Sequence, residues 1–114
     1  GQPAKIVVWA HNSHLGDARA TDMARRGEWN VGQLARENFG AENACLIGFT
    51  TFTGTVAAAS NWDEPAQIKK VRHGLENSYE NLFHQTGLPQ FFLNLRDEKI
   101  RQTLREPLLE RAIG

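Results

Sequence analysis

Two histidines, His11 and His14, stand three residues apart near the start of this 114-residue chain. Imidazole titrates near neutral pH, so these side chains can take a proton from water and pass it to a leaving group. Neutral imidazole is also a common metal ligand. The pair therefore indicates either acid–base catalysis or metal ligation, and two ordinary surface histidines are the structural alternative.

A short apolar run, Ile6 to Ala10, leads directly into the histidines. Its length and β-branched content are typical of a buried strand. Side chains alternate along a strand, so the two imidazoles can converge only if the strand ends near His11. Asn12 and Ser13 favour a turn at that point. Because ligand sites in open α/β sheets lie beyond the carboxyl ends of strands, we predict that both imidazoles face one site.

Three further residues are candidates for contact with a ligand. Asp17 follows His14 by three residues, and its carboxylate could orient an imidazole or cap the next helix. Thr50 and Thr51 follow a second apolar run and could hold a polar ligand through their hydroxyls. His84 adjoins an aromatic residue, and we expect it to be a core or surface residue rather than a catalytic one.

Serine catalysis is not favoured by the sequence. No Gly-x-Ser-x-Gly nucleophile elbow occurs in the chain. Ser13 lies between the histidines and could in principle be activated by one of them. Neighbours in a tight turn rarely have the geometry that activation requires, so we expect no serine nucleophile.

The stretch from Ile6 to His14, with Gly16 and Asp17 behind it, resembles the second histidine motif of the erythromycin esterase-like family. That family also includes proteins labelled as succinoglycan-biosynthesis proteins. The resemblance continues over nearly the whole chain, through Gly27-Glu28-Trp29-Asn30-Val31-Gly32, Ile47-Gly48-Phe49-Thr50-Thr51, Gly54-Thr55-Val56, Ser78-Tyr79-Glu80 and Leu109-Glu110-Arg111-Ala112-Ile113-Gly114. The His-Asn-Ser-His block is its most specific part.

The resemblance implies ester hydrolysis by a histidine that activates water. Members of the family resemble a longer chain with a further histidine and acidic motif in its N-terminal half. No Gly-Glu-x-x-His sequence occurs here. We therefore expect this chain to be an incomplete piece of a larger α/β hydrolase-like domain, inactive when isolated.

Charge and cysteine content exclude several classes of partner. Thirteen basic and thirteen acidic side chains balance, so no strong field attracts nucleic acid, and the basic run Lys69, Lys70, Arg72, His73 is expected to be a solvated patch. No apolar run approaches the length of a membrane helix, and we expect no membrane partner. The single cysteine, Cys45, excludes an internal disulfide and suits the cytoplasm. Its apolar neighbours predict a buried position.

Helix signals alternate with apolar runs along the rest of the chain. Asn30, Ser78 and Asp97 are predicted to cap three helices, of which the first ends at Gly40. Strands are predicted at Ile6–Ala10, Cys45–Thr51 and Phe91–Leu95, with Thr55-Val56 opening a second short strand of a hairpin and Asn61–Pro65 forming a loop. This alternation predicts a single α/β segment over residues 1–114, with a mainly parallel central sheet flanked by helices.

The sequence thus predicts an esterase-like hydrolase segment that cleaves a small-molecule ester or lactone. One of His11 and His14 is expected to be the general base and the other to position or protonate the substrate, while Asn12, Asp17, Thr50 and Thr51 bind or orient it. We expect no metal and no other cofactor, and self-association through exposed apolar surface. Two alternatives stay open: a metal-dependent hydrolase with both histidines as ligands, and a noncatalytic α/β piece.

Overall fold

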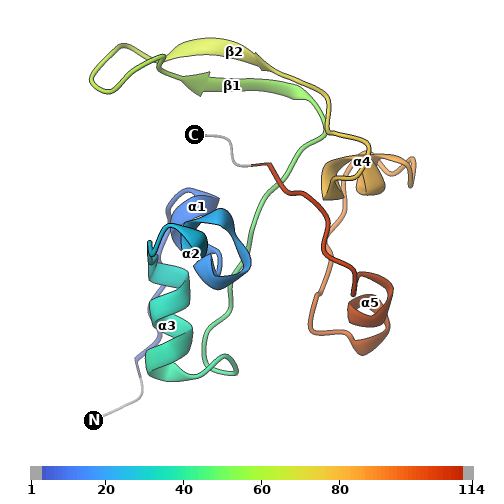
Figure 1. Ribbon diagram of the computed structural model, residues 1–114. Coiled ribbons are helices and arrows are strands. Elements are labelled where there is room, and N and C mark those ends of the chain that lie inside the picture. The colour runs from blue at the N-terminus through green and yellow to red at the C-terminus, as the bar shows by residue number, and fades with distance from the viewer. Residues whose placement is uncertain (1–3, 112–114) are drawn as a thin grey trace. The chain divides into compact units, whose positions relative to one another are not determined.

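The computed structural model describes residues 4–111. Its elements are α1 (Asn12–Leu15), the 3-10 helix η1 (Ala18–Ala20), α2 (Asp22–Arg25), α3 (Val31–Phe39), β1 (Gly54–Ala58), β2 (Gln67–Val71), α4 (Tyr79–His84) and α5 (Glu98–Thr103) (Figure 1). They fall into two compact units that divide between Phe49 and Thr50. Each unit is described separately below.

Local capping signals correctly predicted where three helices begin. The side chains of Asn30, Ser78 and Asp97 accept backbone N–H groups at the starts of α3, α4 and α5. Such caps satisfy N–H groups that have no partner inside the helix. Gly40 ends α3 with a positive φ of 84°, as expected of a glycine at this position. The helix boundaries therefore follow from short-range chemistry.

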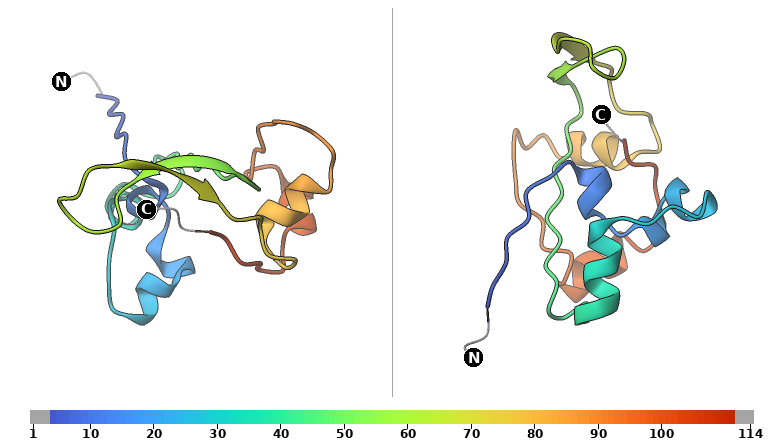
Figure 2. Two further views of the ribbon diagram at one scale, coloured as in Figure 1. Left: turned by 90° about the horizontal axis from the view of Figure 1, so that it is seen from above. Right: turned by 90° about the vertical axis from the view of Figure 1, so that its left-hand side faces the viewer.

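The predicted parallel sheet is wrong. Within residues 4–111 the only sheet is a two-stranded antiparallel hairpin, in which Gly54 pairs with Val71 and Ala58 with Gln67. The left view of Figure 2 shows β1 and β2 running side by side. Thr55-Val56 does open a hairpin strand, but its partner is β2 rather than Cys45–Thr51. The described residues therefore do not form an α/β hydrolase-like fold.

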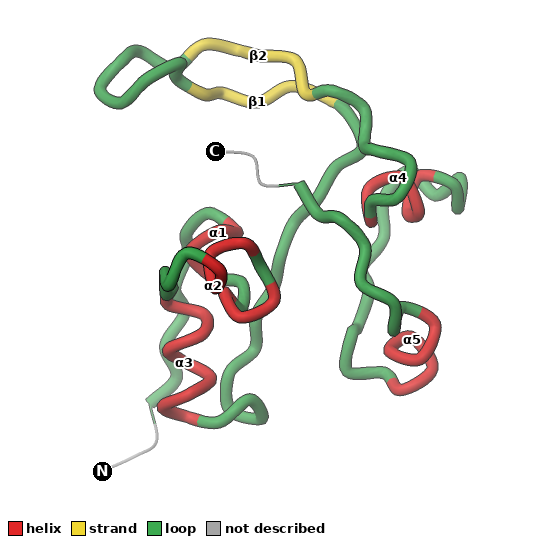
Figure 3. The backbone as a smooth tube through the Cα atoms, viewed as in Figure 1, coloured by secondary structure: helices red, strands yellow, loops and turns green. Residues whose placement is uncertain are grey.

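The three predicted strands are irregular in the structure. Ile6–Ala10, Cys45–Thr51 and Phe91–Leu95 contain no strand residues, and they belong to the loop segments drawn green in Figure 3. An apolar run indicates that a segment tends to be buried, but it does not specify which strand would pair with it. By contrast, β1 and β2 are close in sequence, so they pair at a small entropic cost of loop closure. Parallel pairing needs long crossovers, and within residues 4–111 it is limited to an isolated bridge between Ser78 and Leu109.

Little apolar surface is buried in the part of the chain that the structure describes. Ala18 and Ala44 are its buried hydrophobic residues, and large side chains such as Trp9 and Phe39 are exposed. Cys45 is exposed too, contrary to the prediction, whereas its neighbour Ala44 is buried. None of the helices in residues 4–111 is long and apolar enough to cross a bilayer.

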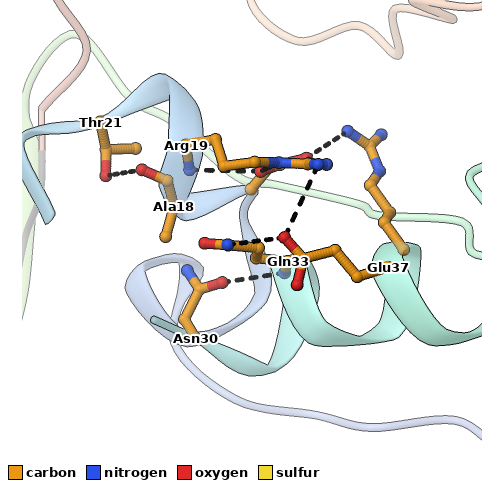
Figure 4. Close-up of polar contacts among 8 residues, drawn as sticks. Ala18, Arg19, Thr21, Asn30, Gln33 and Glu37 are labelled. Atoms are coloured by element: carbon orange, nitrogen blue, oxygen red, sulfur yellow. Dashed lines mark hydrogen bonds and ion pairs between the residues drawn. The ribbon is translucent and has the colours of Figure 1, made fainter. Parts of the chain in front are cut away.

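A carboxylate with two arginine partners ties the first unit together. Asp17 accepts hydrogen bonds from Arg19 Nε at 2.9 Å, Arg19 Nη2 at 2.7 Å and Arg36 Nη1 at 3.2 Å. It also caps η1. These bonds, the one to Arg19 foremost, hold the pKa of Asp17 well below its usual range. Figure 4 shows Arg19 lying over α3, where it also approaches Glu37.

A buried carboxylate, Glu80, organises the second unit. Glu80 in α4 is 2% exposed and accepts hydrogen bonds from the Thr50 hydroxyl at 2.7 Å and the Arg111 N–H at 3.0 Å. Burial alone would raise the pKa of Glu80, but these bonds lower it. Desolvation and the charge of Glu80 raise the pKa of Glu110. Glu80 thus joins α4 to two segments distant in sequence.

Aromatic stacking adds to this unit. The Phe52 ring stacks on His84 with centroids 3.9 Å apart and on His73 at 5.0 Å. Phe83 packs edge-on against Phe91 at 5.5 Å. His84 is exposed and packs against Phe52, a residue that the sequence did not indicate as its partner.

We expect Asp17→Asn to destabilise the first unit by about 1–3 kcal/mol, because it removes charge-assisted hydrogen bonds while keeping a capping side chain. Amide hydrogen exchange in α3 measures this local stability. Asp22→Asn is the matched control, since the Asp22–Arg25 pair is largely exposed and should contribute less than about 1 kcal/mol. Equal effects of the two substitutions would contradict the assigned role of Asp17.

The second unit should lose stability in acid through Glu80. Its folded pKa is lowered, so the contribution is complete above the unfolded pKa of about 4.3 and is lost as pH falls through the folded pKa. The protection factor of the Arg111 amide against hydrogen exchange should therefore fall below about pH 4, and Glu80→Gln should flatten this dependence. The exposed Glu76 supplies the control Glu76→Gln, and an unchanged pH profile in Glu80→Gln would refute the prediction.

Candidate functional site

The His-Asn-Ser-His block forms a single helical turn, α1, at the end of the extended N-terminal segment. His11 is its N-cap, and the chain turns at Asn12 and Ser13 as the sequence predicts. His11 precedes the helical turn with an extended backbone, and His14 follows three residues later within the turn. Both side chains are exposed. The two imidazoles are therefore open to a substrate from one turn.

The two nitrogens of His11 have different surroundings. Nδ1 accepts the Ser13 backbone N–H at 3.2 Å and lies 2.9 Å from the Ser13 hydroxyl. An Nδ1 that accepts carries no proton, so the neutral ring holds its proton on Nε2. Ser13, rather than Asp17, holds this ring. Its hydroxyl also has the hydrogen-bond reach to His11 that we expected a tight turn to prevent.

The ring of His14 has no such partner. Among residues 4–111 no hydrogen bond or ion pair involves its side chain. Its nitrogens are therefore available to water or a ligand, in contrast to Nδ1 of His11. This difference separates two imidazoles that the sequence presents as equivalent.

Asn12 clamps the turn to a segment far away in the sequence. Its Nδ2 donates to the Phe49 carbonyl, and its Oδ1 accepts the Phe49 N–H at 3.1 Å. The side-chain amide thus pairs with a backbone peptide as a neighbouring strand would. Both ends of the Asn12 amide hold the protein backbone, and its predicted contact with a substrate stays a prediction.

Asn30 and Gly32 dock α3 onto α1. The Asn30 side chain caps α3 through the Gln33 N–H at 3.0 Å (Figure 4) and donates to the Ser13 carbonyl at 2.9 Å. A Cβ on Gly32 would lie only 2.0 Å from the Leu15 carbonyl oxygen. Only glycine permits this approach. The backbone carrying the histidines is therefore fixed from two sides.

The other predicted site residues are engaged within the protein. Asp17 binds arginines and caps η1, which is the capping role that the sequence allowed. Thr50 donates its hydroxyl to Glu80, and Thr51 donates to the Thr53 carbonyl at 2.7 Å. Both threonines belong to the second unit. Contact of these three residues with a substrate stays a prediction.

Sequence reasoning missed the residues that hold the turn. Asn30 was predicted only as a cap, and its second bond to Ser13 has no sequence signal. In the second unit, Glu80 appeared only as part of a family-like stretch, and no sequence signal gave its bonds to Thr50 and Arg111. The structure therefore adds positioning residues to a motif that was already recognised.

The described residues do not provide a complete set of metal ligands. Within residues 4–111 no three or more histidine, cysteine, aspartate or glutamate side chains are grouped so that they could hold a metal ion. Structural and catalytic zinc sites use three or four protein ligands. His11 and His14 supply two, and the expectation that this chain binds no metal stays a prediction.

Comparison with known proteins identifies the family to which this chain belongs. No solved structure matches this chain. The family model described as Erythromycin esterase matches residues 1–114, which is the whole chain. This match agrees with the resemblance carried by the histidine turn and its flanking segments. The chain belongs to the erythromycin esterase family.

Proposed function

We propose that this chain supplies the histidine pair of an ester hydrolase, with His14 as the general base and His11 as a hydrogen-bond donor. Membership of the erythromycin esterase family suggests a hydrolase-type function. The observation that carries the finer proposal is the single turn α1, which exposes both imidazoles on a backbone held by Asn12 and Asn30.

The division of roles follows from the nitrogen environments. His11 uses the Nδ1 lone pair to accept from Ser13, which leaves Nε2–H as its outward group. A nitrogen that already bears hydrogen donates to an oxygen and cannot remove a proton. His14 has unengaged ring nitrogens among the described residues. His14 is therefore the residue suited to deprotonate water.

The reaction proceeds by direct attack of water on the ester carbonyl. His14 takes one proton as the water oxygen bonds to the carbonyl carbon. The carbonyl oxygen becomes an oxyanion, which accepts a hydrogen bond from His11 Nε2–H. The carbon–oxygen bond to the alcohol then breaks, and His14 returns its proton to the leaving oxygen. A carboxylic acid and an alcohol result, and His14 regains its starting state.

The tight turn also explains how such groups stay aligned. Acid–base catalysis depends on holding the proton acceptor within hydrogen-bond reach of the attacking water. The bonds from Asn12 to Phe49 and from Asn30 to Ser13 remove backbone freedom on either side of the histidines. We assign Asn12 to positioning, in place of direct substrate binding.

The small-molecule ester substrate, self-association and the cytoplasmic location stay predictions. So does the need for residues outside this chain. The exposed apolar side chains of the extended segment and of α3 are of the kind that partners cover. We therefore propose that the complete site needs cover from other protein, and assays of turnover should use the natural protein.

We expect His14→Ala to lower kcat for ester hydrolysis by about 10²–10⁴-fold, as for other general bases. Added imidazole should restore part of this loss, because it supplies the missing base without altering the fold. His73→Ala and His84→Ala are controls that should stay within a fewfold of wild type. A folded, fully active His14→Ala protein would return His14 to the status of a surface residue.

His11→Asn separates capping from catalysis. Asparagine is among the best N-cap residues, so α1 should persist, as judged by circular dichroism and amide exchange at Ser13. The variant has no imidazole Nε2–H, and we expect kcat to fall by about 10²-fold or more, comparable with loss of an oxyanion donor. Wild-type turnover with an intact turn would show that His11 serves only as a cap.

A further inference from the structure

The β1–β2 hairpin presents two different faces. In the antiparallel register Thr55 lies opposite Lys70, and Val56 lies opposite Lys69. Side chains alternate across a strand, so these two pairs point to opposite sides. Val56 and Lys69 are half-buried, whereas Thr55 and Lys70 are exposed. The two neighbouring lysines therefore have different environments.

A shallow hollow of about 590 Å³ opens at the end of the hairpin where β1 begins and β2 ends. Lys70, Arg72 and His73 line it from the β2 side, and Thr53, Gly54 and Thr55 from the β1 side. The hollow thus combines two permanent cations, an imidazole and two hydroxyls. No carboxylate is among its lining residues.

Three donors in the hollow have no protein partner. Within residues 4–111 the Thr55 hydroxyl, the Lys70 ammonium and the Arg72 guanidinium make no hydrogen bond or ion pair with another residue. By contrast, Lys69 on the opposite face donates to the Ser60 hydroxyl at 2.8 Å. Basic groups gathered in a concave surface without acidic partners raise the local concentration of anions.

We infer that this hollow binds the oxyanion group of a small molecule, a phosphate or a carboxylate, between Lys70, Arg72 and Thr55. The planar guanidinium of Arg72 can offer two parallel N–H donors to such a group. Lys70 adds a point charge, and Thr55 adds a short hydroxyl donor. Gly54 carries no side chain that would narrow the hollow from β1. The site is independent of the proposed histidine chemistry in the first unit.

The residues that line the hollow favour binding of a small anion over binding of a nucleic acid. A strand of RNA or DNA needs a basic track and aromatic platforms on which bases stack. No tryptophan, tyrosine or phenylalanine lines the hollow, and the chain as a whole has no net charge. Two cations and a hydroxyl match the size and charge of one oxyanion.

An NMR titration of the ¹⁵N-labelled chain with inorganic phosphate tests this inference. Sodium chloride is adjusted to hold the ionic strength constant, because screening alone would otherwise move exposed charges. We expect saturable shifts of the amides of Thr53 to Thr55 and of Lys70 to His73. A parallel titration with acetate distinguishes the two oxyanions. Tighter binding of phosphate would indicate a phosphate ligand, and tighter binding of acetate would indicate a carboxylate.

Matched lysine variants provide the control. Lys70→Gln and Arg72→Gln should each weaken phosphate binding by about fivefold or more, while Lys70→Arg keeps the charge and should retain binding. Lys69→Gln removes the same charge from the other face and should change the affinity less than twofold. The Thr55–Lys70 register, checked by cross-strand nuclear Overhauser effects, confirms that the hairpin persists.

Two results would overturn the inference. One is the absence of saturable shifts at the hairpin with both phosphate and acetate. The other is an equal loss of binding in Lys69→Gln and Lys70→Gln, which would indicate attraction by overall charge. Neither result bears on ester hydrolysis, so the two proposals fail independently.

Discussion

The buried amide of Asn30 is the contact on which the arrangement of the first unit depends. Only 7% exposed, it accepts the Gln33 N–H with its oxygen and donates to the Ser13 carbonyl with its nitrogen. One side chain thus begins α3 and holds the histidine turn. A serine or aspartate could cap the helix, but neither carries the amide donor that Ser13 receives. The close approach of Gly32 to Leu15 depends on the same docking.

Buried polar side chains hold distant segments together in both units. Asn30 and Glu80 each bind backbone or hydroxyl groups of segments 17 to 31 residues away. An unpaired buried polar group is costly, so each of these side chains specifies one arrangement of its partners. Apolar contacts contribute less, since Ala18 and Ala44 are the buried hydrophobic residues among those described. The units are therefore defined by matched hydrogen bonds more than by a packed core.

Features that depend on contacts between residues close in the sequence could be predicted, and features that depend on distant contacts could not. Asn30, Ser78 and Asp97 cap helices through bonds to residues two or three positions away, and all three were recognised. The strands at Ile6–Ala10 and Phe91–Leu95 were wrong, because apolar content does not specify a backbone partner. The bond between Asn12 and Phe49 joins residues 37 positions apart and leaves no periodic pattern. The histidine motif was visible, whereas the groups that orient it were not.

Coupling between Asn30 and His14 tests the central claim that the clamp acts through the histidine turn. Asn30→Asp keeps an oxygen that caps α3 and replaces the donor to Ser13, so kcat for ester hydrolysis should be measured with this change in both wild type and His14→Ala. We expect Asn30→Asp to lower kcat in the wild type and to have little further effect once His14 is absent. The same fold-loss in both backgrounds, or no loss in either, would contradict the account.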